Sequence, residues 1–143
     1  MLSIPTCNNQ TLISPPYVKP HYGQAIAQCI ISEYLLKYFP YEDLKLYEIG
    51  AGNGSLAMDI LNFIQDRHPE VYERTRYTII EISSSLAERQ RQALRSVHEC
   101  VEVVHKSIFR WNKTEPAPCF VVMMEVIVSF CFQSTQVIIL TAA

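Results

Sequence analysis

The chain has 143 residues, of which 49% are hydrophobic, and its formal net charge is −2. This length is sufficient to bury the core of one domain, and the lack of a basic excess argues against nucleic acid as a partner. The five cysteines are scattered, with no C-x-x-C pair and no histidine cluster at metal-ligand spacing. We therefore expect reduced thiols and no metal site.

The chain alternates predicted helices and strands. Residues 1–20 form an extended, proline-rich segment with neither a secretory signal nor an arginine-rich transit peptide. Apolar residues then recur at helical spacing over 21–39, and Pro40 ends that helix. The later predicted elements are a strand at 45–49, a helix at 54–66, a strand at 77–81, a helix opened by the capping box Ser85–Glu88, and strands at 101–105 and 119–124. Such alternation predicts an α/β fold with a parallel sheet in the order three, two, one, four.

The most informative stretch is residues 46–56, LYEIGAGNGSL. An apolar run ends near Glu48, and Gly50, Gly52 and Gly54 alternate after it before a helical pattern begins. A strand, a glycine-rich turn and a helix in this order form the first turn of a nucleotide-binding sheet, where the backbone approaches the ligand closely. A tight strand-to-helix connection without a ligand would give the same pattern.

The second predicted strand supports the nucleotide interpretation. Residues 77–81 read YTIIE, an apolar strand that ends in Glu81, and an acid there accepts hydrogen bonds from ribose hydroxyls. The glycine spacing is G-x-G-x-G rather than the dinucleotide pattern G-x-G-x-x-G. Together with Glu48 and Glu81 it resembles the pattern of S-adenosylmethionine methyltransferases more than that of NAD-binding proteins. Glu81 follows Gly54 by 27 residues, and Pro69 can open a short extra helix within this long crossover.

Several segments between Ser14 and Val126 resemble the MidA-type methyltransferases, the mitochondrial complex I assembly family of protein arginine methyltransferases, and especially its fungal branch. The segments are SPPYVKPHYGQAIAQCI, YEIGAGNGSL, YTIIEISSSLAERQ, and SIFRWN followed by PCFVVMMEV. The element E-x-S-x-x-L-x-x-x-Q, formed by Glu81, Ser83, Leu86 and Gln90, is more specific to the family than the glycine loop. The resemblance implies a Rossmann-like methyltransferase fold, S-adenosylmethionine as cofactor, a mitochondrial location and a protein substrate, a subunit of respiratory complex I.

The resemblance also assigns roles to individual positions. The three glycines would line the methionine moiety, Glu81 would hold the ribose, and Ser107 and Ile108 would lie against the adenine. Tyr17 and Tyr22 would cover the ligand, or pack in the core or at its rim. The expected cofactor-binding residues are Glu48, Gly50, Gly52, Gly54, Glu81, Ser83, Ser107 and Ile108.

The resemblance stops after Val126, where the chain continues IVSFCFQSTQVIILTAA. We therefore divide it into the segment 1–20, a partial methyltransferase domain at 21–126 that is incomplete on its C-terminal side, and a non-homologous apolar tail at 127–143. The catalytic residues are unknown, with Glu125 the one candidate acid for an arginine acceptor. We expect little methyl transfer from this chain alone.

The apolar stretch 119–140 admits a membrane-spanning helix, but Glu125 interrupts it, and a mid-span carboxylate costs about 2.5–3.5 kcal/mol. A buried strand followed by an added strand or a loose tail at 137–140 is the favoured interpretation. Three functions stay open for the chain. The first is a protein arginine methyltransferase of the mitochondrial assembly type, and the second is a non-catalytic remnant that binds the methyl donor or a partner. The third is an NAD-dependent oxidoreductase, against which the glycine spacing argues.

Overall fold

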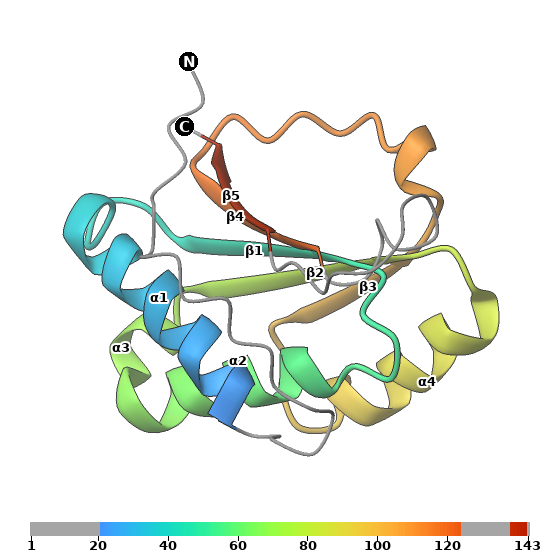
Figure 1. Cartoon of the computed structure of the whole chain (residues 1–143), viewed down its shortest axis with the longest axis horizontal. Coiled ribbons are helices and arrows are strands. Elements are labelled where there is room, and N and C mark those ends of the chain that lie inside the picture. The colour runs from blue at the N-terminus through green and yellow to red at the C-terminus, as the bar shows by residue number, and fades with distance from the viewer. Residues whose placement is uncertain (1–20, 124–137, 143) are drawn as a thin grey trace.

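The computed structural model describes residues 21–123 and 138–142, which form one α/β unit (Figure 1). In chain order its elements are α1 (His21–Lys37), β1 (Leu44–Ile49), α2 (Ser55–Arg67), α3 (Pro69–Tyr72), β2 (Thr75–Glu81), α4 (Ser84–Arg95), β3 (Val101–His105), the 3-10 turn η1 (Ile108–Arg110), β4 (Cys119–Met123) and β5 (Ile138–Ala142). The predicted α/β class and the four predicted strands are confirmed. Glu125 and Tyr17 lie outside the described residues.

The five strands form a single sheet in the order β3-β2-β1-β4-β5. The first four pair in parallel, so the predicted order three, two, one, four is confirmed. β5 pairs antiparallel with β4, for example Val121 opposite Leu140. The strand added at 137–140 is thus realised as Ile138–Ala142, and the edge of β4 that would otherwise be left unpaired has a partner.

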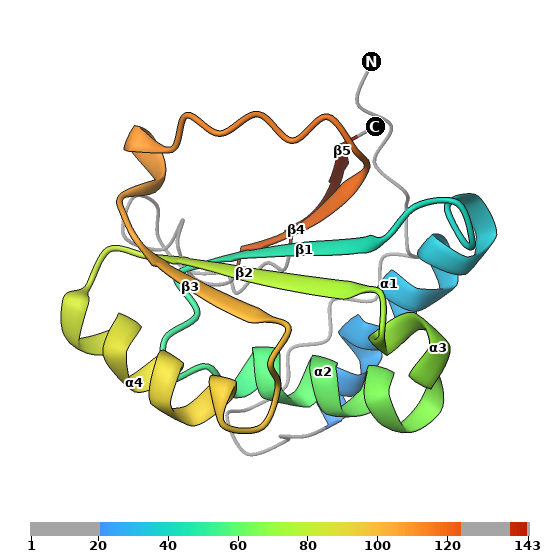
Figure 2. The ribbon, with the colours of Figure 1, turned by 180° about the vertical axis from the view of Figure 1, so that it is seen from behind.

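Helices α1 to α4 lie on one face of the sheet (Figures 1 and 2). β1 shows why, because its side chains alternate between the two faces. Leu44 and Leu46 belong to the large core under the helices, whereas Tyr47 and Ile49 belong to a smaller cluster on the opposite face. Within the described ranges 21–123 and 138–142, no helix is both long and apolar enough to cross a membrane.

Helix α1 packs closely against α2. A Cβ atom at Gly23 would lie only 2.4 Å from the Cβ of Asp59, so a larger residue at this position would force the two helices apart. The inward side of α1 is apolar, and Ala27, Ile31 and Tyr34 are almost completely buried there. This contact orders α1 against the unit that carries the glycine loop.

The helix boundaries confirm one local prediction and correct another. Pro69 opens α3, as its position in the long crossover predicted. The capping box Ser85–Glu88 was wrong, because α4 begins two residues earlier than that motif implies. Its N-cap is Ser83, whose Oγ accepts a hydrogen bond from the Leu86 amide at 3.4 Å. A strand that ends at Glu81 leaves only a short turn before the helix, so the first available hydroxyl takes the cap.

Candidate functional site

The glycine-rich loop lies at the carboxyl end of β1, beside the carboxyl end of β2. Gly50, Gly52 and Gly54 have φ values of 68°, 58° and 82°, a left-handed region that glycine enters at no steric cost. The amide of Gly50 donates to the Ile80 carbonyl at 3.0 Å, which holds the loop against β2. The sequence pattern therefore produces the expected sharp turn at the edge where open α/β sheets bind ligands.

Gly52 and Gly54 face different surroundings. A Cβ atom built on Gly52 meets no atom within 4 Å, so this position borders open space. A Cβ atom on Gly54 would lie 3.1 Å from Cδ1 of Leu94 in α4. Gly52 is thus the glycine beside which a ligand has room, whereas Gly54 allows the start of α2 to pack against α4.

The carboxylate of Glu81 is buried and held by two donors. The backbone amide of Ser83 donates to its Oε1 at 2.9 Å, and Nε2 of Gln90 donates to its Oε2 at 3.0 Å. The same Gln90 nitrogen donates to the carbonyl of Gly52 at 2.7 Å. The structure therefore brings Glu81 and the glycine loop together through one side chain of α4.

A second buried carboxylate, Glu48, lies at the end of β1. Its Oε2 accepts a hydrogen bond from the Tyr77 hydroxyl at 2.8 Å. Burial raises the pKa of Glu48 to about 7; the Tyr77 hydrogen bond lowers it and the negative charge of Glu81 raises it further. No lysine, arginine or histidine within the described ranges forms an ion pair with Glu48 or Glu81.

The remaining predicted site residues surround the end of β2. The Ser83 amide donates to Glu81, and the Ser83 hydroxyl accepts the hydrogen bond that caps α4. Ser107 is the N-cap of η1, shortly after β3, and Ile108 packs against the smaller cluster on the face opposite α1 to α4. The Lys106 amide donates to the Glu81 carbonyl at 2.9 Å, which brings the start of this segment to the end of β2. Tyr22, on α1, packs against the main core.

Two residues at this edge were not among the predicted site residues. Ile82 follows Glu81 directly and is 70% exposed, an unusual position for a large apolar side chain at the end of a buried strand. Gln90 is completely buried, and the sequence analysis gave it no role beyond its place in the family element. A signal existed for both, since Ile82 lies within and Gln90 ends the E-x-S-x-x-L-x-x-x-Q element.

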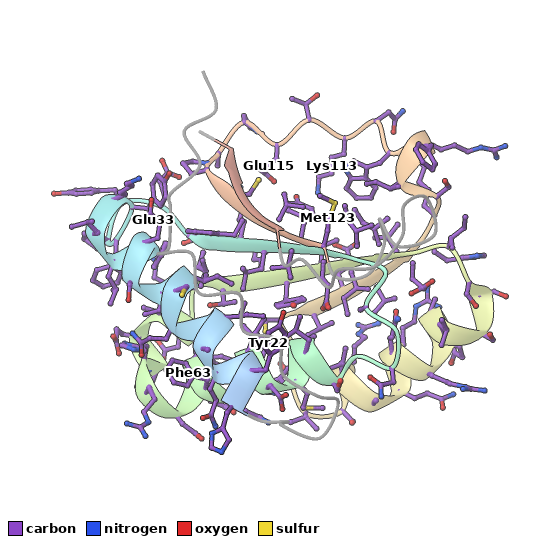
Figure 3. All side chains as sticks on the ribbon, viewed as in Figure 1. Tyr22, Glu33, Phe63, Lys113, Glu115 and Met123 are labelled. Carbon is purple, nitrogen blue, oxygen red and sulfur yellow. The ribbon has the colours of Figure 1, made fainter. Side chains whose placement is uncertain are left out.

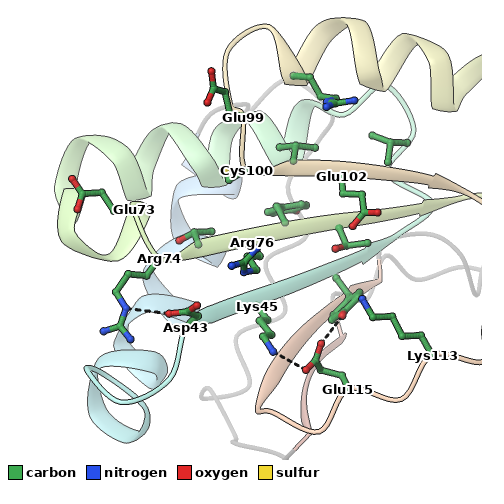
Figure 4. Close-up of a pocket in the computed structure, with 17 residues that line it drawn as sticks. Asp43, Lys45, Glu73, Arg74, Arg76, Glu99, Cys100, Glu102, Lys113 and Glu115 are labelled. Carbon is green, nitrogen blue, oxygen red and sulfur yellow. Dashed lines mark hydrogen bonds and ion pairs between the residues drawn. The ribbon is translucent and has the colours of Figure 1, made fainter.

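A hollow of about 830 Å³ lies elsewhere, along the amino-terminal parts of β1, β2 and β3 (Figure 4). Charged side chains of both signs line it. Lys45 forms an ion pair with Glu115 at 2.7 Å, and Arg74 forms one with Asp43 at 3.1 Å. Glu115 belongs to the segment that crosses the sheet on the side opposite α1 to α4 (Figure 3). Ligands of open α/β sheets bind at the carboxyl ends of the strands, and this hollow lies at their amino ends. We therefore do not place the S-adenosylmethionine site in this hollow.

Comparison with known proteins identifies the family. Residues 25–136 match the family model described as "Putative S-adenosyl-L-methionine-dependent methyltransferase". The chain belongs to this methyltransferase family. The chain is also 37% identical over 114 residues to a Schizosaccharomyces pombe protein, "Protein arginine methyltransferase NDUFAF7 homolog, mitochondrial". This alignment covers 76% of the chain and 24% of the relative, so the chain spans about a quarter of the relative's length.

Solved structures share the fold. A Burkholderia thailandensis protein crystallised with S-adenosyl-homocysteine is 24% identical, with a TM-score of 0.53, over 74% of this chain and 25% of that one. A second structure from the same organism gives a TM-score of 0.52 at 22% identity, over 76% of this chain and 26% of that one. The Rossmann-like methyltransferase fold expected from the sequence is confirmed.

Proposed function

We propose that this chain carries the S-adenosylmethionine-binding part of a protein arginine methyltransferase. The observation that carries the proposal is the Glu81 carboxylate, fixed by Ser83 and Gln90 beside the open space at Gly52. A carboxylate offers about four lone-pair directions, and protein donors occupy two of them. The two that remain match the two hydroxyls of a ribose.

The proposed ligand extends in two directions from this ribose. Its methionine end follows the glycine loop past Gly52, and its adenine lies near Ser107, Ile108 and the exposed Ile82, which offers a flat ring an apolar contact. Glu48 and Glu81 have no ion-pair partner in the described part of the chain. A cationic ligand would therefore meet the negative charge of Glu81 in a buried setting, where electrostatic attraction is stronger than in water.

The acceptor is proposed from the relative's name. The fission-yeast protein is called a mitochondrial protein arginine methyltransferase, and from that name we extend to this chain a protein arginine as acceptor and a mitochondrial location. The resemblance of the sequence to the complex I assembly family adds a complex I subunit as the proposed partner. When bound, the donor supplies an electrophilic methyl group, so the protein has mainly to position the two reactants. Glu125 remains our candidate for orienting the guanidinium, which stays protonated at neutral pH.

Calorimetry on the 143-residue chain tests this proposal. S-adenosylhomocysteine should bind with a stoichiometry of one, and NAD should bind more weakly or not at all. Preference for NAD would establish the oxidoreductase alternative and overturn the proposal. A chain that binds S-adenosylhomocysteine but transfers no methyl group to a mitochondrial extract would match the donor-binding remnant instead.

A further inference from the structure

Gln90 makes two contacts that no other described side chain makes together. Its Nε2 has two hydrogens, and the structure uses one on the Gly52 carbonyl and the other on the Glu81 carboxylate. Both partners are acceptors, so the amide nitrogen and not the amide oxygen must face them. One rigid planar group therefore sets the separation between the glycine loop and the acid of β2.

The other half of the same amide shows what this arrangement costs. Oε1 of Gln90 is buried and accepts no hydrogen bond from any residue in the described ranges. A buried acceptor without a donor destabilises the folded state, and a leucine of similar size would avoid that penalty. The glutamine is therefore poorly explained by packing alone, and its two donated hydrogen bonds are the remaining reason for its presence.

We propose that Gln90 is a positioning residue that aligns Glu81 with the glycine loop so that the ribose and methionine ends of one donor molecule bind at the same time. The inference rests on the proposed function and goes beyond it by adding a residue that does not touch the ligand. Without Gln90, Ser83 still binds one oxygen of Glu81, but the carboxylate is free to rotate and the Gly52 carbonyl loses its donor.

The test compares Gln90→Leu with Gln92→Leu by calorimetry on the full 143-residue chain. Gln92 belongs to the same helix but is exposed, and its side-chain amide donates a hydrogen bond to Glu88, which makes it a matched control. Loss of a hydrogen bond to a charged group predicts about 10- to 100-fold weaker binding of S-adenosylhomocysteine for Gln90→Leu. Gln92→Leu should bind within about twofold of the wild type.

A second ligand separates positioning from a general structural effect. The 2′,3′-dideoxy analogue of S-adenosylhomocysteine cannot use Glu81, so the wild type should strongly prefer the natural ligand. In Gln90→Leu the ratio of the affinity for the natural ligand to that for the analogue should fall towards one. In Gln92→Leu this ratio should stay at the wild-type value. A variant that loses affinity for both ligands by the same factor would overturn the inference, as would a variant that binds like the wild type.

Two further observations keep the outcome decisive. If the wild type itself fails to bind S-adenosylhomocysteine, the proposed function fails, whereas normal wild-type binding with an unaltered Gln90→Leu ratio removes only the inference. If Gln90→Leu does not fold, the side-chain amide resonances of Gln90 in the wild type provide the test. They should shift when S-adenosylhomocysteine is added, and unchanged resonances at saturating ligand would overturn the proposal.

Discussion

Acidic side chains at the two ends of the parallel sheet differ in whether a basic side chain pairs with them. At the amino-terminal end, Asp43 pairs with Arg74 and Glu115 pairs with Lys45, and the Tyr47 hydroxyl also donates to Glu115 at 2.9 Å (Figure 4). The Lys45 contact keeps the pKa of Glu115 below its ordinary value. Each of these acids is already neutralised by the protein.

The carboxyl-terminal end leaves its acids without a cation. Glu48 receives a hydrogen bond from a tyrosine, and Glu81 receives hydrogen bonds from an amide and a glutamine, all of which are neutral donors. Burial makes such an arrangement costly for a charged group. We therefore expect the ligand at the carboxyl-terminal edge, where Glu48 and Glu81 lack a cationic partner among the described residues, rather than in the charge-balanced hollow.

The largest effect should come from closing the open space at Gly52. Gly52→Val places a β-branched side chain at a φ of +58° and into the space assigned to the donor. We expect S-adenosylhomocysteine affinity to fall by more than about 100-fold, or about 3 kcal/mol. Calorimetry measures this affinity. A second comparison measures the melting temperatures of Gly52→Ala and Gly54→Ala. Gly54→Ala should lower the melting temperature more, because its Cβ meets Leu94.

The second prediction concerns pH. In the folded state the pKa of Glu48 is raised from 4.5 to about 7, so the stability associated with its neutral form is complete below about pH 4.5 and is lost as the pH rises through 7. This shift corresponds to about 3 kcal/mol. Denaturant unfolding of the wild type and Glu48→Gln from pH 4 to pH 8 should show the decline only in the wild type. Parallel curves would contradict the assignment to Glu48.

The third prediction addresses the ribose contact. Glu81→Ala should weaken S-adenosylhomocysteine binding by about 1.5–3 kcal/mol, the usual value for hydrogen bonds to a charged group. The change should leave binding of free homocysteine, which lacks the ribose, unaffected. Competition binding of the two ligands measures this, and equal losses for both would show that Glu81 supports the loop rather than the ribose.

The smallest effect is expected at the opposite end of the sheet. Glu115→Gln removes a partly exposed ion pair with Lys45, and such pairs contribute about 1 kcal/mol or less. S-adenosylhomocysteine affinity should not change, because we place the ligand at the opposite end of the sheet. Weakened donor binding in this variant, measured by the same calorimetry, would break the distinction between the two ends.

The local sequence was sufficient for the order of elements and for the edge that carries the site. Glycines at every second position after an apolar strand define a turn that only glycine tolerates, and a terminal acid on the next strand must reach the same edge of a parallel sheet. These constraints act over a few residues, so Gly50, Gly52 and Glu81 could be placed without a structure. The cap of α4 was placed wrongly because Ser83 and Ser85 both offer a hydroxyl, and only the length of β2 selects between them.

Other features depended on contacts between distant segments. Gln90 ends the E-x-S-x-x-L-x-x-x-Q element of the sequence, but its hydrogen bonds to Gly52 and Glu81 exist only because α4 packs against both the loop and β2. The different roles of Gly52 and Gly54 likewise depend on where Leu94 lies. The raised pKa of Glu48 requires burial beneath the helices, which a sequence pattern does not report. The sequence by itself determined which chemical groups reach the edge, and tertiary packing decided which of them are neutralised, fixed or left open to a ligand.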